Sequence, residues 1–233
     1  MTLRRIFTIL GLGGAMLLAA CGNDDKRLDP KQVAGIIRQG VQDRYNPPPD
    51  RDKDALIEAA SREALTLAPP EDPLASIRFD SVGSAAVLRR IETNGQHIVW
   101  AAWGSSDRKS IITKNGMITA TRGLRKDLMS AEADAVLGLV RNLEEGDVPY
   151  TLRYLDGDFE VVEAKYTCTV SRGYDKTVAL ATGPTPALQM FSSCVSANRV
   201  FVDLFLVDYS GRIIEMRQWV GPILGFAYMA QLR

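Results

Sequence analysis

Hydrophobic and polar positions alternate along most of the chain from residue 76 to residue 233, and this is the period of a half-buried β-strand. β-Branched and aromatic residues are frequent in the alternating segments, and turn dipeptides separate the segments. The strongest turn is Asn115-Gly116, a pair typical of a type I′ hairpin. The pattern predicts strands at 76–82, 86–92, 97–104, 110–114, 117–122, 150–155, 159–170, 199–207 and 212–220.

Helical spacing replaces the alternation in three segments. Apolar residues recur at helical intervals between residues 133 and 143, with Ser130 as the predicted N-cap and Gly146 as the predicted stop. A second helix is expected to begin at Asp29-Pro30, and a third to run from Asp52 to Leu65 with only a thin apolar stripe. We therefore expect a few amphipathic helices that pack against the strands.

The first residues have the features of a cleaved leader. Arg4-Arg5 precedes an apolar stretch from Ile6 to Leu18, and Leu18-Ala19-Ala20-Cys21 follows as a lipoprotein cleavage motif. An apolar stretch of about 13 residues is too short to span a bilayer. The motif predicts that lipid is attached to Cys21. Because Gly22, and not Asp, follows the cysteine, we expect a lipid-anchored protein of the outer membrane that faces the periplasm.

These patterns divide the chain into three parts. They are a lipoprotein signal peptide (1–20), a lipidated tether with N-terminal helices (21–75) and a β-rich periplasmic domain (76–233). About 160 residues can bury a substantial core. Antiparallel strands joined by hairpins predict a mainly β fold with a few helices, either an antiparallel curved sheet or an incomplete β-barrel packed by amphipathic helices.

Charge and motif content exclude several functions. The chain has 28 basic and 28 acidic residues, and removal of the leader leaves a formal charge of about −2, which gives no basic field for nucleic acid. Asp156 and Asp158 fit a hairpin tip better than a calcium loop, and the single His97 has no catalytic relay. No nucleophile elbow, zinc cluster or phosphate loop is present in the sequence. We expect no metal, no cofactor and no enzymatic activity.

Cys168 and Cys194 remain in the body of the chain after Cys21 is lipidated. Because an exported protein meets an oxidising compartment, their pairing in a disulfide is the default expectation. The bond would close a loop of about 26 residues and stabilise the fold by roughly 3 to 4 kcal/mol. A reactive thiol is the less favoured alternative, since the spacing is not that of a redox pair.

Two further groups of residues are candidates for either structure or recognition. Arg122 and Asp127 are predicted to form an ion pair that clamps a strand-to-helix corner; the alternative is that Arg122 recognises an acidic sugar or a phosphate. Alternation places Trp100 and Trp103 on opposite faces of one strand. An exposed Trp103 or Trp219 would suit a sugar ring, although core packing is favoured.

Several separated motifs carry a resemblance to a known family. They are Leu18-Ala19-Ala20-Cys21, Asn115-Gly116, 120–124 with 127–129, 154–157, 168–170, Asp208, 211–213, 217–220 and Pro222. On these residues the chain resembles the YjbF-like lipoproteins of exopolysaccharide and group 4 capsule loci, over residues 75 to 233. The resemblance implies an outer-membrane lipoprotein with a β-rich body that assists polysaccharide production or export and is not an enzyme.

Two functions from different classes follow. The first is a non-enzymatic accessory factor that binds polysaccharide export or assembly proteins, or the polysaccharide itself. The second is a periplasmic half-barrel carrier or chaperone for an acyl chain or a lipoprotein, with a groove lined by residues such as Phe201, Phe205 and Val207. A polysaccharide-modifying enzyme is a weaker third. The apolar segment from Trp219 to Leu232 is expected to be buried against the sheet, with a partner or membrane surface as the alternative.

Overall fold

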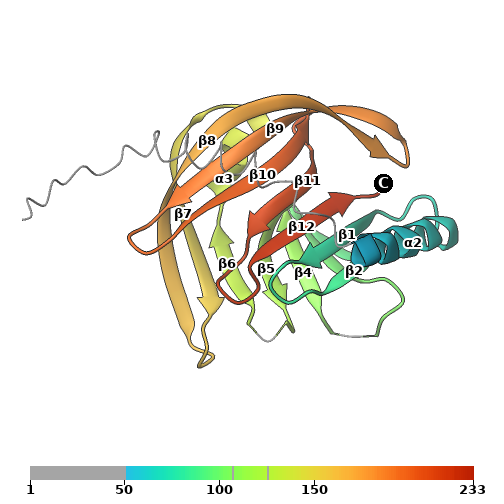
Figure 1. Cartoon of the computed structure of the whole chain (residues 1–233), viewed down its shortest axis with the longest axis horizontal. Helices are drawn as coiled ribbons and strands as arrows, with labels where there is room; N and C mark the ends of the chain where they lie inside the picture. Colours follow the sequence, from blue (N-terminus) through green and yellow to red (C-terminus); the bar gives the residue numbers. More distant parts are fainter. Residues whose placement is uncertain (1–50, 107, 125) are drawn as a thin grey trace, which may run out of the picture.

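A computed structural model describes residues 51–106, 108–124 and 126–233. Twelve antiparallel strands form one sheet in the order β5-β4-β3-β2-β1-β12-β11-β10-β9-β8-β7-β6. The sheet curves into a nearly closed barrel, with one seam between its end strands (Figure 1). The predicted mainly β fold with an incomplete barrel is therefore confirmed. Cys21 and the helix predicted at Asp29-Pro30 lie outside the described residues, and the predicted domain limits stay a prediction.

The elements follow the chain in simple succession. The helices are α2 (Arg51–Leu67) and α3 (Asp134–Asn142). The strands are β1 (Leu74–Phe79), β2 (Ala85–Asn94), β3 (His97–Ala102), β4 (Ser110–Lys114), β5 (Met117–Arg122), β6 (Leu128–Glu132), β7 (Gly146–Leu155), β8 (Val161–Leu180), β9 (Gly183–Val195), β10 (Val200–Asp208), β11 (Ile213–Trp219) and β12 (Phe226–Gln231).

The hairpin between β4 and β5 forms where Asn115-Gly116 predicted it. Asn115 has φ 47° and Gly116 has φ 95°, so both turn residues adopt the left-handed backbone that a type I′ turn requires. A side chain at position 116 would also lie 2.9 Å from Cβ of Ile213 on β11. The Asn-Gly pair therefore sets the strand register and lets the hairpin pack closely against the opposite side of the barrel.

Three strands were not predicted: β6, β9 and β12. β9 is buried on both faces along most of its length, so it lacks the alternation that identifies a half-buried strand. The apolar C-terminal segment forms β12, which pairs with both β1 and β11. It is thus a strand of the sheet, and not a segment packed on top of it.

The limits predicted for α3 are wrong at both ends. Ser130 lies in β6, and the helix begins after Ala133 without a side-chain cap. It ends at Leu143 in the left-handed conformation, and Gly146 already belongs to β7. The helix forms because its buried apolar face packs on the barrel, while pairing with β7 holds the predicted cap residue in a strand.

Both faces of β10 are buried. Phe201, Phe205 and Val207 belong to the main core inside the barrel, whereas Val202 and Leu204 on the other face pack in a second cluster with residues of β8 and β9. Figure 1 shows the long β8–β9 hairpin arching over toward the C-terminus, where the Ala181 amide donates to the Leu232 carbonyl oxygen. The hairpin therefore covers an apolar face that would otherwise be exposed.

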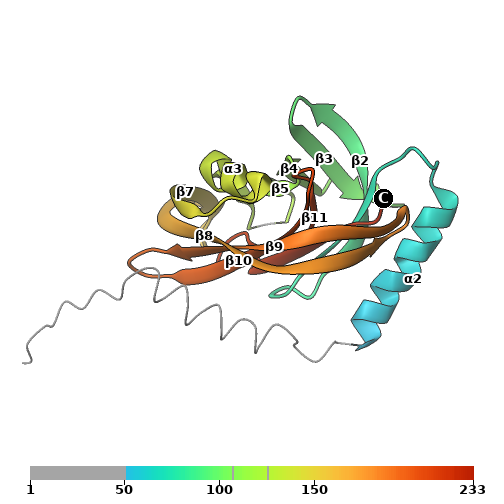
Figure 2. The same cartoon turned by 90° about the horizontal axis from the view of Figure 1, so that it is seen from above.

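Helix α2 lies against the outside of the barrel, beside β1 and β2 (Figure 2). Ala64 of the helix is fully buried in its contact with Leu74 and Val87, and Ala68, directly after the helix, joins the same cluster. The thin apolar stripe thus gives the light packing that the sequence predicted.

Candidate functional site

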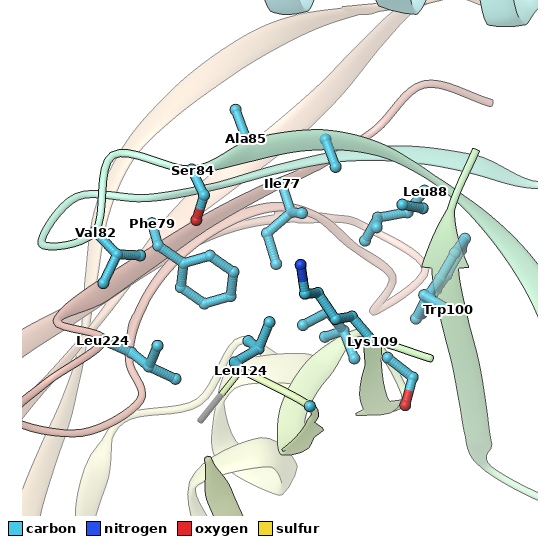
Figure 3. Close-up of a pocket in the computed structure, with 15 residues that line it drawn as sticks. Ile77, Phe79, Val82, Ser84, Ala85, Leu88, Trp100, Lys109, Leu124 and Leu224 are labelled. Carbon is cyan, nitrogen blue, oxygen red and sulfur yellow. The ribbon is translucent and has the colours of Figure 1, made fainter. Parts of the chain in front are cut away.

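An apolar pocket of about 510 Å³ opens between β1, β2, β3 and β4. The segments that follow β1, β3 and β5 and the loop before β12 complete its wall (Figure 3). The lining residues are Ile77, Phe79, Val82, Ser84, Ala85, Ala86, Leu88, Trp100, Ala102, Lys109, Ser110, Ile111, Gly123, Leu124 and Leu224. Its volume is in the range of small-molecule binding sites, about 300 to 1,000 Å³.

Small side chains are the reason that this part of the interior is hollow. Ala86 on β2 and Ala102 on β3 face the pocket, whereas large side chains such as Tyr150 and Phe205 fill the barrel elsewhere. Of the lining residues, only Ser84, Lys109 and Ser110 have polar side chains, and none has a carboxylate. The pocket can therefore bind an apolar group, but its own side chains supply no acid and base pair.

The tryptophans follow the predicted alternation. Trp100 is buried in the pocket wall, and its Nε1 donates to Oγ1 of Thr113 at 2.9 Å. Trp103 is half-buried on the opposite face, against the cluster under α2. Trp219 is only 8% exposed and stacks on Phe201, with ring centroids 5.9 Å apart. Trp219 thus packs in the core, as was favoured, and the alternative of an exposed ring that stacks on a sugar does not hold.

Asp127 organises the corner between β5 and β6. It is buried, and its carboxylate accepts hydrogen bonds from Oγ1 of Thr121 at 2.8 Å, from the Gly123 amide at 3.0 Å and from the Leu124 amide at 3.1 Å. Gly123 and Leu124 also line the pocket. One carboxylate thus fixes both the end of β5 and a wall of the pocket.

Arg122 lies at the same corner with different partners from those predicted. Its guanidinium donates to the carbonyl oxygens of Thr121 at 2.6 Å, Leu128 at 3.3 Å and Met129 at 3.3 Å. The predicted ion pair between Arg122 and Asp127 is therefore wrong. The Asp127 carboxylate instead accepts hydrogen bonds from Thr121, Gly123 and Leu124. Arg122 instead links the edge strands β5 and β6 across the seam.

Gln218 on β11 is a seam residue that the sequence reasoning missed. Its Oε1 accepts from the Ile118 amide at 2.8 Å, and its Nε2 donates to the Ile118 carbonyl oxygen at 2.8 Å and to the Tyr150 hydroxyl at 3.2 Å. A fully buried amide thus takes the place of a strand partner for the edge strand β5. The sequence did contain a signal for this role. Gln218 lies in the Arg217-Gln218-Trp219 motif, and a polar side chain among apolar strand positions needs a hydrogen-bond partner when it is buried.

Asp203 on β10 was also missed. It is fully buried, and its Oδ1 accepts from the Trp219 amide at 2.7 Å, while its Oδ2 has no partner among the described residues. Burial raises the pKa of Asp203 to about 8, although the Trp219 amide and the charge of Arg217 oppose the change. The pKa of nearby Tyr150 is raised well above its usual value, first by burial and then by Asp203. Asp203 does not line the pocket. Because it accepts the Trp219 amide, it positions Trp219 in the core.

Cys168 and Cys194 are joined in a disulfide between β8 and β9. The two residues are direct partners in the strand register, and both are buried. The predicted disulfide is therefore present. In the described ranges no group of three or more His, Cys, Asp or Glu side chains could hold a metal ion. Neither of the helices described combines the length and the hydropathy of a transmembrane helix.

Comparison with protein families gives a match over most of the chain. The model of a family described as group 4 capsule polysaccharide lipoprotein, gfcB and YjbF, matches residues 58–232. The chain belongs to this YjbF family. It is by family a capsule-associated lipoprotein, as the resemblance implied. None of the curated proteins compared with the chain matches it.

Solved structures with similarity to the chain include three bacterial proteins. The lipoprotein YmcC from Escherichia coli K12 is 16% identical, with a TM-score of 0.62 over 79% of this chain and 94% of YmcC. An exported protein with a YmcC-like fold from Bacteroides fragilis is 10% identical, with a TM-score of 0.27 over 70% of this chain and 93% of that protein. A lipoprotein from Parabacteroides distasonis is 9% identical, with a TM-score of 0.27 over 70% and 94%. The likeness to YmcC supports the barrel fold.

The two most specific motifs of the family resemblance meet at the seam. The Thr121 to Leu124 segment and Asp127 form its corner, and Gln218 of the Arg217 to Trp219 segment reaches it from β11. In the structure these residues make internal hydrogen bonds. The pocket takes only Gly123 and Leu124 from them.

Proposed function

We propose that this YjbF family member is an outer-membrane lipoprotein that acts as a non-enzymatic accessory factor in exopolysaccharide or capsule production or export. The match of the family model to residues 58–232 carries the proposal, because it covers nearly the whole barrel. Lipid on Cys21 would anchor the chain, and the barrel would face the periplasm. Several acyl chains on one cysteine bury enough methylenes, at about 0.8 kcal/mol each, for stable attachment.

The chemistry of the described residues supports an accessory role. The pocket lining holds no carboxylate, and the family motifs are used in hydrogen bonds that close the barrel. The partners would be polysaccharide export or assembly proteins, or the polysaccharide itself. A chain with 28 basic and 28 acidic residues offers no general attraction for nucleic acid.

A carrier for an acyl chain or a lipoprotein is the second candidate, and one observation favours it. The groove predicted along Phe201, Phe205 and Val207 is wrong, because these side chains are buried and packed in the main core. The apolar pocket beside β1 to β4 supports a carrier at a different place in the barrel.

Deletion and complementation in the native host test the accessory role. A deletion strain is expected to lose most of its surface polysaccharide, and the wild-type gene is expected to restore it. A Cys21→Ser variant should restore less, because the barrel then lacks its anchor. Quantification of cell-surface polymer checks both results, and a deletion strain with normal polymer would contradict the proposal.

The anchor and its membrane are tested separately. Labelling with a radioactive fatty acid is expected to mark the wild-type protein and not the Cys21→Ser variant. Density-gradient separation of membranes should recover the labelled protein with the outer membrane. Recovery with the inner membrane would contradict the proposed outer-membrane location. It would not affect the proposed role in polysaccharide production, which the deletion experiment tests.

A further inference from the structure

We infer that a polar cleft across the seam of the barrel binds a neutral sugar unit of a polysaccharide. The cleft has a volume of about 380 Å³ and lies where the end strands β5 and β6 meet (Figure 1). β3, β4 and β5 supply one wall, and β6, the first turn of α3 and β7 supply the other. The polar residues of its lining are His97, Lys114, Thr119, Glu132, Asp134 and Thr151.

The lining of the cleft suits a ligand that is rich in hydroxyl groups. A hydroxyl both donates and accepts hydrogen bonds, so a sugar needs donors and acceptors close together. The ammonium of Lys114 supplies donors, and the carboxylates of Glu132 and Asp134 supply acceptors. The hydroxyls of Thr119 and Thr151 supply both. The apolar pocket on β1 to β4 has no such mixture, so the two hollows of the barrel select different ligands.

Thr151 is the lining residue that most needs a partner. It is 8% exposed, and its hydroxyl makes no hydrogen bond within the part of the chain that the structure describes. Thr119 is also 8% exposed, and its hydroxyl makes only a long contact of 3.4 Å with the Ile112 carbonyl oxygen. A buried polar group without a partner costs about 1 to 3 kcal/mol. A sugar hydroxyl in the cleft would supply the missing partner.

Ion pairs hold the charged groups of the cleft in place. Nζ of Lys114 lies 2.5 Å from Oδ1 of Asp134, and this pair joins β4 to α3 across the seam. NH1 of Arg153 lies 2.7 Å from Oε1 of Glu132. The other oxygen of each carboxylate, Oδ2 of Asp134 and Oε2 of Glu132, has no partner among the described residues. These acceptors are positioned before a ligand arrives, which lowers the entropic cost of binding.

The same groups argue against other classes of ligand. Lys114 is already paired with Asp134, and the carboxylate of Glu132 would repel an anion. A metal ion would need a group of three or more His, Cys, Asp or Glu side chains, and the described part of the chain has none. An apolar ligand would take water from the charged groups and give them no hydrogen bond in return. A neutral ligand with many hydroxyls avoids each of these costs.

The cleft is open enough for part of a polymer. The side chains of Asp134 and Glu132 are 76% and 62% exposed, so they form a rim that water reaches. One sugar unit can enter while the rest of the chain continues into solvent. The inference rests on the proposed function only for the source of the sugar, which would be the polysaccharide that this lipoprotein helps to produce or export.

Isothermal titration calorimetry of the mature chain from residue 21 with Cys21→Ser tests the inference. The probe is the neutral fraction of the oligosaccharides that partial acid hydrolysis releases from the surface polysaccharide of the native host. Saturable binding is expected for this fraction. The acidic fraction is expected to bind more weakly, because Glu132 and Asp134 repel it. Ala86→Phe, which fills the apolar pocket, should leave oligosaccharide binding unchanged.

Matched variants assign the binding to the cleft. Thr151→Val replaces the hydroxyl by a methyl group and is expected to weaken binding about three- to tenfold. It should not lower the midpoint of urea unfolding, because the hydroxyl has no partner in the described protein. Thr177→Val, at an exposed position of β8, should change affinity by about twofold or less. Ala135→Phe fills the cleft and should abolish binding, whereas Ala59→Phe, at an exposed position of α2, should not.

The inference is overturned if neither fraction binds saturably, if Ala135→Phe folds and binds like the wild type, or if Thr151→Val and Thr177→Val weaken binding equally. Shortened oligosaccharides in mass spectra after incubation would also overturn it, in favour of hydrolysis. Circular dichroism of each variant verifies folding. Loss of surface polymer in the deletion strain without oligosaccharide binding would overturn the cleft alone, and normal polymer with saturable binding would overturn the accessory role alone.

Discussion

The seam of the barrel and the apolar pocket lie side by side, but they are built from opposite kinds of side chain. At the seam, buried polar groups of Asp127, Thr121 and Gln218 bond to backbone atoms. In the pocket, hydrocarbon side chains surround a space that small residues leave open. The loop with Gly123 and Leu124 belongs to both regions. The residues that are most specific to the family resemblance therefore close the barrel. The space for an apolar ligand is formed mainly by residues outside those motifs.

This difference has a physical cause. An open barrel leaves two edge strands whose backbone groups need partners inside a protein. Side chains of defined geometry must supply these partners, so the seam demands particular residue types. A pocket demands only that apolar side chains be small enough in the right places. The following substitutions test this contrast, from the largest expected effect to the smallest.

Asp127→Ala is expected to destabilise the protein most, by about 4 kcal/mol. It removes a buried carboxylate and leaves Oγ1 of Thr121 and the amides of Gly123 and Leu124 without their acceptor. Urea unfolding measures the free energy of unfolding. Asp158→Ala, at an exposed turn position, serves as the matched control and should cost less than about 0.5 kcal/mol. Equal losses at the two positions would contradict the seam role of Asp127.

Gln218→Leu is expected to cost about 3 kcal/mol, because it nearly keeps the volume but leaves the Ile118 amide and carbonyl oxygen unsatisfied. Gln218→Glu keeps the acceptor and loses the donor to the Ile118 carbonyl oxygen. Equilibrium unfolding monitored by circular dichroism measures both variants. If Gln218→Leu were as stable as the wild type, the amide would not act as a substitute for a strand partner.

Asp203 should make stability depend on pH, with a sign opposite to that of an ordinary carboxylate. Its folded pKa is about 8 against 3.8 for the free group, so between these values the unfolded chain has lost a proton that the folded protein keeps. The contribution is therefore complete below about pH 4 and is lost as pH rises through about 8. From pH 5 to pH 8 the free energy of unfolding of Asp203→Asn is expected to rise by roughly 4 kcal/mol relative to that of the wild type, because each pH unit in this range contributes about 1.4 kcal/mol.

Urea unfolding of both proteins at the two pH values measures this difference. Comparison with the wild type removes the contribution of other groups, among them Glu215, whose pKa burial also raises. A difference in unfolding free energy that does not change with pH would mean that Asp203 is ionised in the folded protein.

A pair of identical substitutions compares the hollow and the filled interior directly. Ala227→Leu introduces a large side chain into the packed core and should cost about 1 to 3 kcal/mol. Ala86→Leu enters the pocket and should change stability by less than about 1 kcal/mol, because there is space for it. Thermal unfolding of the two variants checks the contrast, and equal losses would mean that the pocket is not open in solution.

Sequence reasoning found the elements that have local signals. The β4–β5 hairpin follows from Asn115-Gly116, and the disulfide follows from an oxidising compartment and two remaining cysteines. β9 was missed because burial on both faces removes its alternation. Nor could the partners of Arg122 be predicted, since its choice of carbonyl oxygens depends on where β6 lies.

The pocket was beyond reach of the sequence for a related reason. Its wall combines residues from Ile77 to Leu224, and nothing in the local pattern brings Leu124 and Leu224 to the same space. The predicted groove at Phe201 and Phe205 had the right character, apolar and concave. It was placed on strands whose inner side chains fill the barrel.

A crystal structure of the mature Cys21→Ser chain grown with laurate tests the central claim most directly. We expect electron density for one acyl chain between Ile77, Leu88 and Trp100. An empty or collapsed pocket in crystals that contain laurate, with the seam intact, would contradict the claim that this part of the barrel is built to hold an apolar chain.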